Sequence, residues 1–263
     1  MDPFYSEWLN LLVRWFHVFA GILWIGSTWY FTWLDRTLHA SPEGVWMVHS
    51  GGFYLVKKQA DPKVDPSKLH WFRFEALFTW LSGLVLLGIV YYAGGLMEDS
   101  AIAPGPAIAC GIGLMIAGWF VYDLFWMSPI ARQPVVGAVL SYLALVALAY
   151  GLTQLFNGRA AYIHLGAMMG TIMALNVWVR ILPAQKKLVA SIARGEQPDP
   201  VLAERAKNRS KHNTFIILPV VMTMISNHFP TATSGCKFSK SIGARKSRGR
   251  RLSLALRDTS GAA

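Results

Sequence analysis

The stretch LNLLVRWFHVFAGILWIGSTWYFTW, from Leu9 to Trp33, decides the fold because it is long and apolar enough to cross a lipid bilayer. An α-helix needs about 20 predominantly apolar residues to cross roughly 30 Å of hydrocarbon. This stretch has 25 residues, with one arginine and one histidine. A signal peptide would have a shorter apolar stretch and a small-residue cleavage site, and neither is seen here. The stretch therefore predicts a retained membrane-spanning helix.

The rest of the chain has the same character. Its 263 residues are 54% hydrophobic and 15% charged, whereas soluble domains have roughly 25% charged residues. Further apolar blocks lie at Ala76–Gly95, Ile102–Tyr122, Val135–Phe156, Tyr162–Val179 and Thr214–Ile225. The last block is the shortest, at 12 residues. We expect an all-α, polytopic transmembrane helix bundle of about six spans.

Basic loops alternate along the chain with loops that carry few lysines and arginines. Residues 34–74, 123–134 and 182–212 are basic, whereas the loops between them carry little beyond Glu98, Asp99 and Arg159. Basic loops stay on the cytoplasmic side of a membrane. This pattern predicts an amino terminus outside the cytoplasm.

The basic loops also contain local structure signals. In the first, VWMVHSGGFYLVKK has two short β-prone runs around Ser50-Gly51-Gly52, which predicts a small hairpin. In the last, Gln185–Arg194 and Val201–Arg209 are predicted to form two short amphipathic helices, separated by GEQPDP. Their positive charge favours anionic lipid as a partner and not nucleic acid.

The composition changes at Ser234. Residues 234–263 hold eight lysines and arginines against Asp258, and so supply seven of the eleven net positive charges. We predict a transmembrane domain over residues 1–233 and a basic disordered tail over 234–263, for which an out-of-frame end is one explanation.

Three histidines are predicted to share the outer half of the bundle. His17 lies in the first span, His164 begins the fifth and His228 ends the sixth. A buried imidazole in lipid needs a partner, and histidine is the usual axial ligand of haem iron in helix bundles. We predict that these three residues bind a haem, with His17 and His164 as iron ligands. No C-x-x-C-H haem attachment site is present, so this haem would be of b type.

Other polar residues lie within the apolar blocks. Arg14 is one helical turn before His17, where it would bind an anionic substrate or a haem propionate, or extend outward to the headgroups. Arg180 is expected to pair with Asp123 across the bundle in a structural role. Glu75 lies at the start of the second span. It could handle protons, but we favour the interpretation that it is an interfacial cap.

One small-residue motif also stands out. Gly166-Ala-Met-Met-Gly170 has the spacing that lets a second helix approach closely beside His164.

Four strings together resemble one family. They are WFHVFAGILWIGSTWYF, LHWFRFEALFTWLSG, LPAQKKLVASIARGEQPDP and KHNTFIILPVVMTMISNHFP. They look like the amino-terminal membrane region of the bacterial cytochrome-c-linked urate oxidases, also called urate hydroxylases. The resemblance covers nearly all of the chain up to Thr233. Beyond that point the family continues with further membrane helices and a C-x-x-C-H haem module, which these residues lack.

The resemblance implies a multi-pass oxidoreductase of the bacterial inner membrane. It would oxidise urate to 5-hydroxyisourate and pass electrons to cytochrome c or to a c-type haem domain, with urate and the lipid bilayer as its other partners. The resemblance supplies no catalytic residue set. Two alternatives remain open: a non-enzymatic b-type haem subunit that relays electrons, and a porphyrin-handling membrane oxidase.

Overall fold

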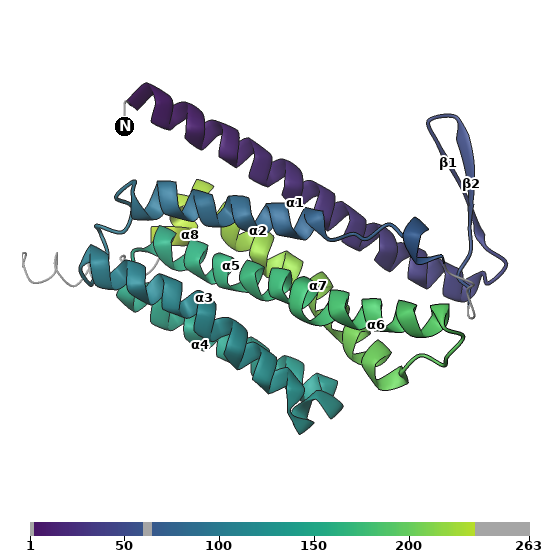
Figure 1. Cartoon of the computed structure of the whole chain (residues 1–263). Coiled ribbons are helices and arrows are strands. Elements are labelled where there is room, and N and C mark those ends of the chain that lie inside the picture. The colour runs from purple at the N-terminus through teal and green to yellow at the C-terminus, as the bar shows by residue number, and fades with distance from the viewer. Residues whose placement is uncertain (1–2, 60–64, 235–263) are drawn as a thin grey trace, which may run out of the picture.

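The computed structural model describes residues 3–59 and 65–234, and it is an all-α bundle with one small hairpin (Figure 1). The tail predicted over residues 234–263 lies outside this range except for its first residue. The principal helices are α1 (Pro3–Ala40), α2 (Phe74–Leu86), α3 (Pro104–Met127), α4 (Pro134–Leu155), α5 (Gly158–Leu175), α6 (Leu182–Ala193) and α7 (Pro200–Ile225). The short elements are η1 (Pro66–Lys68), η2 (Leu87–Tyr92), η3 (Pro129–Arg132), η4 (Asn176–Ile181), η5 (Ser226–His228) and α8 (Pro230–Ser234).

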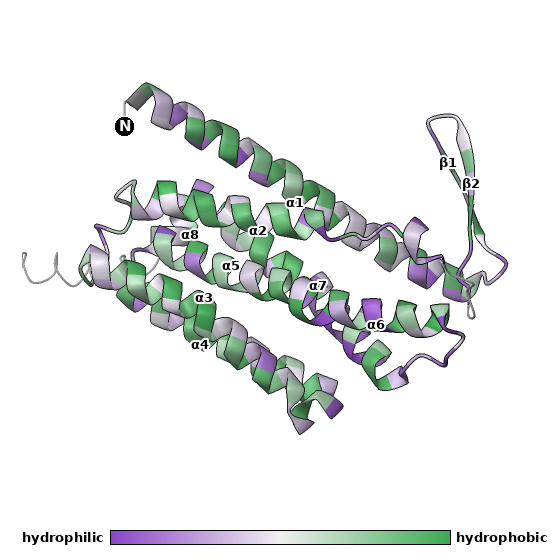
Figure 2. Ribbon diagram, viewed as in Figure 1, coloured by the Kyte–Doolittle hydropathy of each residue, from purple (hydrophilic) through white to green (hydrophobic). Residues whose placement is uncertain are grey.

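Five helices in the described part of the chain are long and apolar enough to cross a membrane. They are α1, α2 with η2, α3, α4, and the continuous helix of α5, η4 and α6. Apolar residues cover most of these helices, as expected where a bundle faces lipid (Figure 2). The predicted all-α membrane bundle is therefore confirmed, while the exact number of spans and their orientation stay predictions.

The structure differs from the sequence-based prediction after α5. Instead of a separate amphipathic helix, Gln185–Arg194 continues the fifth span through the π-helical turn η4, and Pro183 lies in the first turn of α6. Instead of two elements, Val201–Arg209 and Thr214–Ile225 form the single helix α7. Asp199 caps α7 by accepting hydrogen bonds from Val201 N and Leu202 N at 2.8 and 3.3 Å. Proline has no N–H, so Pro219 removes one backbone hydrogen bond inside α7.

The predicted hairpin is confirmed. Strands β1 (Val45–His49) and β2 (Gly52–Val56) pair antiparallel, with His49 opposite Gly52. Ser50 and Gly51 both have positive φ, at 50° and 76°, as a two-residue hairpin turn requires. The hairpin extends away from the bundle at the carboxyl-terminal end of α1 (Figure 1).

Helix α5 is the centre of the bundle. Eleven of its residues are buried, and it packs against α2, α3, α4 and α7. Glycines permit the closest contacts: a Cβ at Gly166 would lie 2.5 Å from Thr223 Oγ1 on α7, which confirms the predicted close approach at this residue. Gly170, the other glycine of the motif, has no neighbour within 4 Å of such a Cβ. In contrast, α1 packs mainly on α2 and exposes most of its large apolar side chains.

Two glycines of α3 give a matched test of this packing. A Cβ at Gly118 would lie 2.5 Å from Met168 Cγ on α5, whereas one at Gly113 meets nothing within 4 Å. We expect Gly118→Leu to lower the unfolding free energy by about 1–3 kcal/mol, because the added side chain overpacks the α3–α5 contact. Gly113→Leu should leave it unchanged. Thermal unfolding in detergent, followed by tryptophan fluorescence, measures both, and equal midpoints for the two variants would contradict this account.

Candidate functional site

His17 lies on α1, and its ring packs against α2. Its Nδ1 lies 3.0 Å from Thr79 O and 3.0 Å from Ser82 Oγ. The Ser82 hydroxyl donates to Phe78 O, so its oxygen is left to accept, and a carbonyl can only accept. In the neutral imidazole the proton of His17 therefore sits on Nδ1, which leaves the lone pair of Nε2 available. A histidine that donates Nδ1–H to a carbonyl while Nε2 is free to bind metal has the usual arrangement of a metal or haem ligand.

His164 lies in a different environment, fully buried on α5. Its Nδ1 donates to Ala160 O at 2.7 Å, and Nε2 accepts from Tyr92 OH at 3.2 Å. The ring also contacts Phe156, with centroids 5.1 Å apart, and a Cβ at Gly111 would lie 2.6 Å from Nε2. Both ring nitrogens are therefore bonded and α3 closes over the ring. As arranged, His164 does not fit an iron ligand.

The structure does not bring the three predicted histidines together. His17 contacts α2 at Thr79 and Ser82, whereas His164 contacts Tyr92 of η2, which is roughly 15 Å further along at 1.5 Å per residue. His228 ends η5 and is exposed. Residues 3–59 and 65–234 contain no cluster of three or more histidine, cysteine, aspartate or glutamate side chains that could hold a metal ion. Haem binding stays a prediction, and of the two predicted iron ligands only His17 has a ring nitrogen without a hydrogen bond to any described residue.

Arg14 is exposed on α1 and donates to Asn10 Oδ1 at 3.0 Å. It lies one turn before His17 on the same helix. Its guanidinium retains donors for an anion, so its predicted role in substrate binding stays a prediction.

A buried polar network, which we call the Asp123 cluster, joins α3, the α5–η4 segment and α7. Its members are Tyr122, Asp123, Asn176, Arg180, Arg209, His212 and Asn213. Asp123 Oδ1 accepts from Arg180 Nε at 2.9 Å and from Arg209 Nη2 at 2.8 Å, and Oδ2 accepts from Arg180 Nη2. The predicted Asp123–Arg180 pair is thus confirmed, and Arg209 is a second partner that the sequence-based prediction missed.

Amide and hydroxyl groups complete the Asp123 cluster. Asn176 Nδ2 donates to Tyr122 OH and to Asn213 Oδ1, both at 3.0 Å, and Asn213 Nδ2 donates to Met173 O at 3.0 Å. Tyr122 OH also pairs with His212 Nδ1 at 2.8 Å. Two guanidinium groups share one carboxylate, so these groups carry one net positive charge. Such dense mutual bonding indicates that the cluster fixes helix positions.

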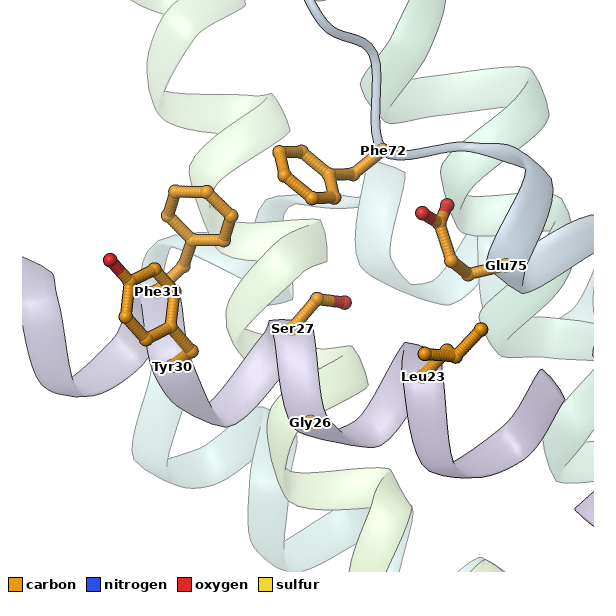
Figure 3. Close-up of a pocket in the computed structure, with 7 residues that line it drawn as sticks. All are labelled: Leu23, Gly26, Ser27, Tyr30, Phe31, Phe72 and Glu75. Carbon is orange, nitrogen blue, oxygen red and sulfur yellow. The ribbon is translucent and has the colours of Figure 1, made fainter. Parts of the chain in front are cut away.

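A groove of about 410 Å³ separates α1 from the start of α2. It is lined by Leu23, Gly26, Ser27, Tyr30, Phe31, Phe72 and Glu75, and the Glu75 carboxylate points toward Phe72 (Figure 3). The predicted cap role of Glu75 finds no support, since no hydrogen bond of its carboxylate to a helix N–H occurs among the described residues.

The fold and these polar groups define a polytopic α-helical membrane protein with ionisable groups inside its helix bundle. The family model described as urate oxidase N-terminal matches residues 3–238. The chain belongs to this family, which confirms the resemblance noted from the sequence and supports a urate-related oxidase. Comparison with curated proteins and with solved structures finds no match to this chain.

The Asp123 cluster generates a stability prediction. Asp123→Asn should lower the unfolding free energy by about 3–5 kcal/mol, because Arg209, with 8% of its side chain exposed, would lose its counter-charge. Glu196→Gln is the matched control, since it breaks the exposed Arg194–Glu196 pair and should have no measurable effect. Unfolding of both variants in mixed detergent, compared with the parent protein, measures the difference. A stable Asp123→Asn protein would show that the buried pair is dispensable.

Proposed function

We propose that the protein is a membrane oxidase that converts urate to 5-hydroxyisourate and passes the electrons to cytochrome c or a c-type haem domain. The family match over residues 3–238 is the observation that carries this proposal. The five membrane-length helices support a location in a membrane, for which we propose the bacterial inner membrane.

The proposed reaction balances with water as the oxygen source. Counted from uric acid, one water is added and two electrons and two protons are released. Such chemistry requires a group that binds the purine anion, an electron acceptor and a route for protons. The polypeptide side chains would have to supply the first and third, and a redox group the second.

Arg14 is our candidate for binding the purine anion. A guanidinium presents planar, paired N–H donors that suit the carbonyl oxygens and ring anion of urate. Its neighbour Asn10 orients it through the hydrogen bond to Oδ1. Arg14 and His17 lie three residues apart, so a ligand on Arg14 would lie close to the imidazole.

His17 is our candidate for holding haem b, through Nε2. The bonds of Nδ1 to Thr79 O and Ser82 Oγ would keep the ring in the required tautomer and orientation. A haem bound there would supply one-electron transfer. His164, with both ring nitrogens hydrogen-bonded, would not hold the haem in its present arrangement.

The first test follows urate directly. Membranes containing the protein, supplied with oxidised cytochrome c, should lose the ultraviolet absorbance of urate as cytochrome c is reduced. Arg14→Ala should raise KM for urate about tenfold or more, because a charge-assisted hydrogen bond contributes about 1.5–3 kcal/mol. Arg36→Ala removes an exposed arginine from the same helix and should leave KM unchanged. Persistence of urate with the parent protein would contradict the proposed function.

A second test addresses the haem. Protein expressed with haem supplied should show a Soret band, which His17→Ala should abolish and His228→Ala should retain. The Ser82→Ala variant should keep the band but shift the redox potential of the haem, because it removes one of the two hydrogen bonds of His17 Nδ1. Absence of a Soret band in the parent protein would refute haem binding. A haem-bearing protein that leaves urate intact would instead support the electron-relay alternative.

A further inference from the structure

The groove between α1 and α2 combines features that the proposed function does not use. Aromatic rings form one part of its wall: Phe31 and Phe72 meet edge to face with centroids 5.0 Å apart, and Tyr30 contacts Phe31 at 5.4 Å. Ser27 and Gly26 form its floor on α1, and Glu75 extends a carboxylate into it (Figure 3). The result is an apolar, aromatic slot with one acidic group.

The charge in the groove selects the kind of ligand. Among the described residues no lysine or arginine lines it, and Glu75 is the only ionisable group in that lining apart from the Tyr30 phenol. An ionised Glu75 would repel urate and the phosphate of a lipid headgroup, because like charges in a weakly polar site are costly. A neutral ring with hydrogen-bonding oxygens is favoured, since its faces would pack on the aromatic side chains.

The position of the groove selects a ligand that comes from the bilayer. Its walls belong to α1, which exposes Leu23, Tyr30 and Phe31. Tyr30 lies ten residues before the end of α1, or about 15 Å along the helix. A ligand dissolved in lipid would therefore reach the slot sideways, near one membrane surface.

We propose that this groove binds the headgroup of a lipid-soluble quinone and is a site of its reduction. Quinone reduction takes up two electrons and two protons, which are the numbers that conversion of uric acid and water to 5-hydroxyisourate releases. The quinone would accept these two electrons in place of cytochrome c. In its protonated form Glu75 transfers the two protons to the quinone oxygens one after the other, and it is reprotonated from the aqueous side after each transfer. The inference has a binding half, that the groove binds the quinone, and a redox half, that the quinone is reduced there. The redox half rests on the proposed function, whereas the binding half does not.

Photoaffinity labelling tests the binding half. The full chain in lipid vesicles is irradiated with an azido-benzoquinone that carries a short alkyl tail, and labelled peptides are mapped by mass spectrometry. Labels should concentrate in residues 23–31 and 72–75 and be displaced by excess decyl-benzoquinone. Gly26→Leu should reduce labelling at least fivefold by filling the slot, because a Cβ there meets nothing within 4 Å and the fold should tolerate it. Gly113→Leu, equally open but on α3, should label like the parent protein.

Two results would overturn the inference. One is labelling spread over all the apolar helices without displacement by decyl-benzoquinone. The other is Gly26-dependent labelling of the groove by a phospholipid with a photoreactive acyl chain that decyl-benzoquinone does not displace, which would identify a lipid groove.

Quinol formation tests the redox half. With urate and decyl-benzoquinone under anaerobic conditions, the parent protein should form quinol, measured chromatographically. Glu75→Gln should slow this at least tenfold while its photolabelling stays within twofold of the parent protein. Groove labelling with neither quinol formation nor urate loss, even with cytochrome c, would reject the proposed function and leave quinone binding supported. Urate loss with cytochrome c but no groove labelling would reject quinone binding and leave the proposed function intact.

Discussion

The Asp123 carboxylate is the interaction on which the arrangement of the bundle depends. It accepts hydrogen bonds from Arg180 and Arg209, which come from the π-helical turn η4 and from α7. A buried carboxylate is costly unless it is paired, so α3, η4 and α7 can pack only where all three groups meet. Apolar side chains alone would allow these helices to slide or rotate against each other. The cluster therefore gives a lipid-embedded bundle a specific register.

The two kinds of helix contact in the bundle have different consequences. Around α5, glycines allow backbones to approach closely, and His164 and Thr223 fill the space beside Gly111 and Gly166. Helix α1 packs closely on α2 around His17, where a Cβ at Gly83 would lie 3.0 Å from His17 Cε1, and the groove beside Glu75 lies further along the same two helices. Close packing characterises the structural centre, whereas the α1–α2 contact leaves a groove at Glu75 that a ligand can enter. The two contacts also leave the two histidines in different states. Both ring nitrogens of the buried His164 are hydrogen-bonded, whereas the partly buried His17 uses only Nδ1.

Much of the fold could be predicted because lipid imposes simple rules on a sequence. Long apolar segments identified the spanning helices, and Ser50-Gly51-Gly52 identified the hairpin. The Asp123–Arg180 pair was predictable because each residue is conspicuous in an apolar block. Arg209 and Asn213 were not, since they lie in a polar stretch that resembles an exposed amphipathic helix.

The histidine layer shows a different limit of sequence reasoning. Counting residues from a membrane surface assigns a rough depth, but not the neighbouring helix that a side chain contacts.

Pro219 gives α7 an uneven stiffness. On one side of it, Arg209 and Asn213 fasten the helix to the Asp123 cluster, and on the other Thr223 lies against Gly166. The missing N–H lies between these two anchors, so bending costs least there. Helix α7 is therefore held on both sides of Pro219, and the proline marks the position between these contacts where the helix bends most easily.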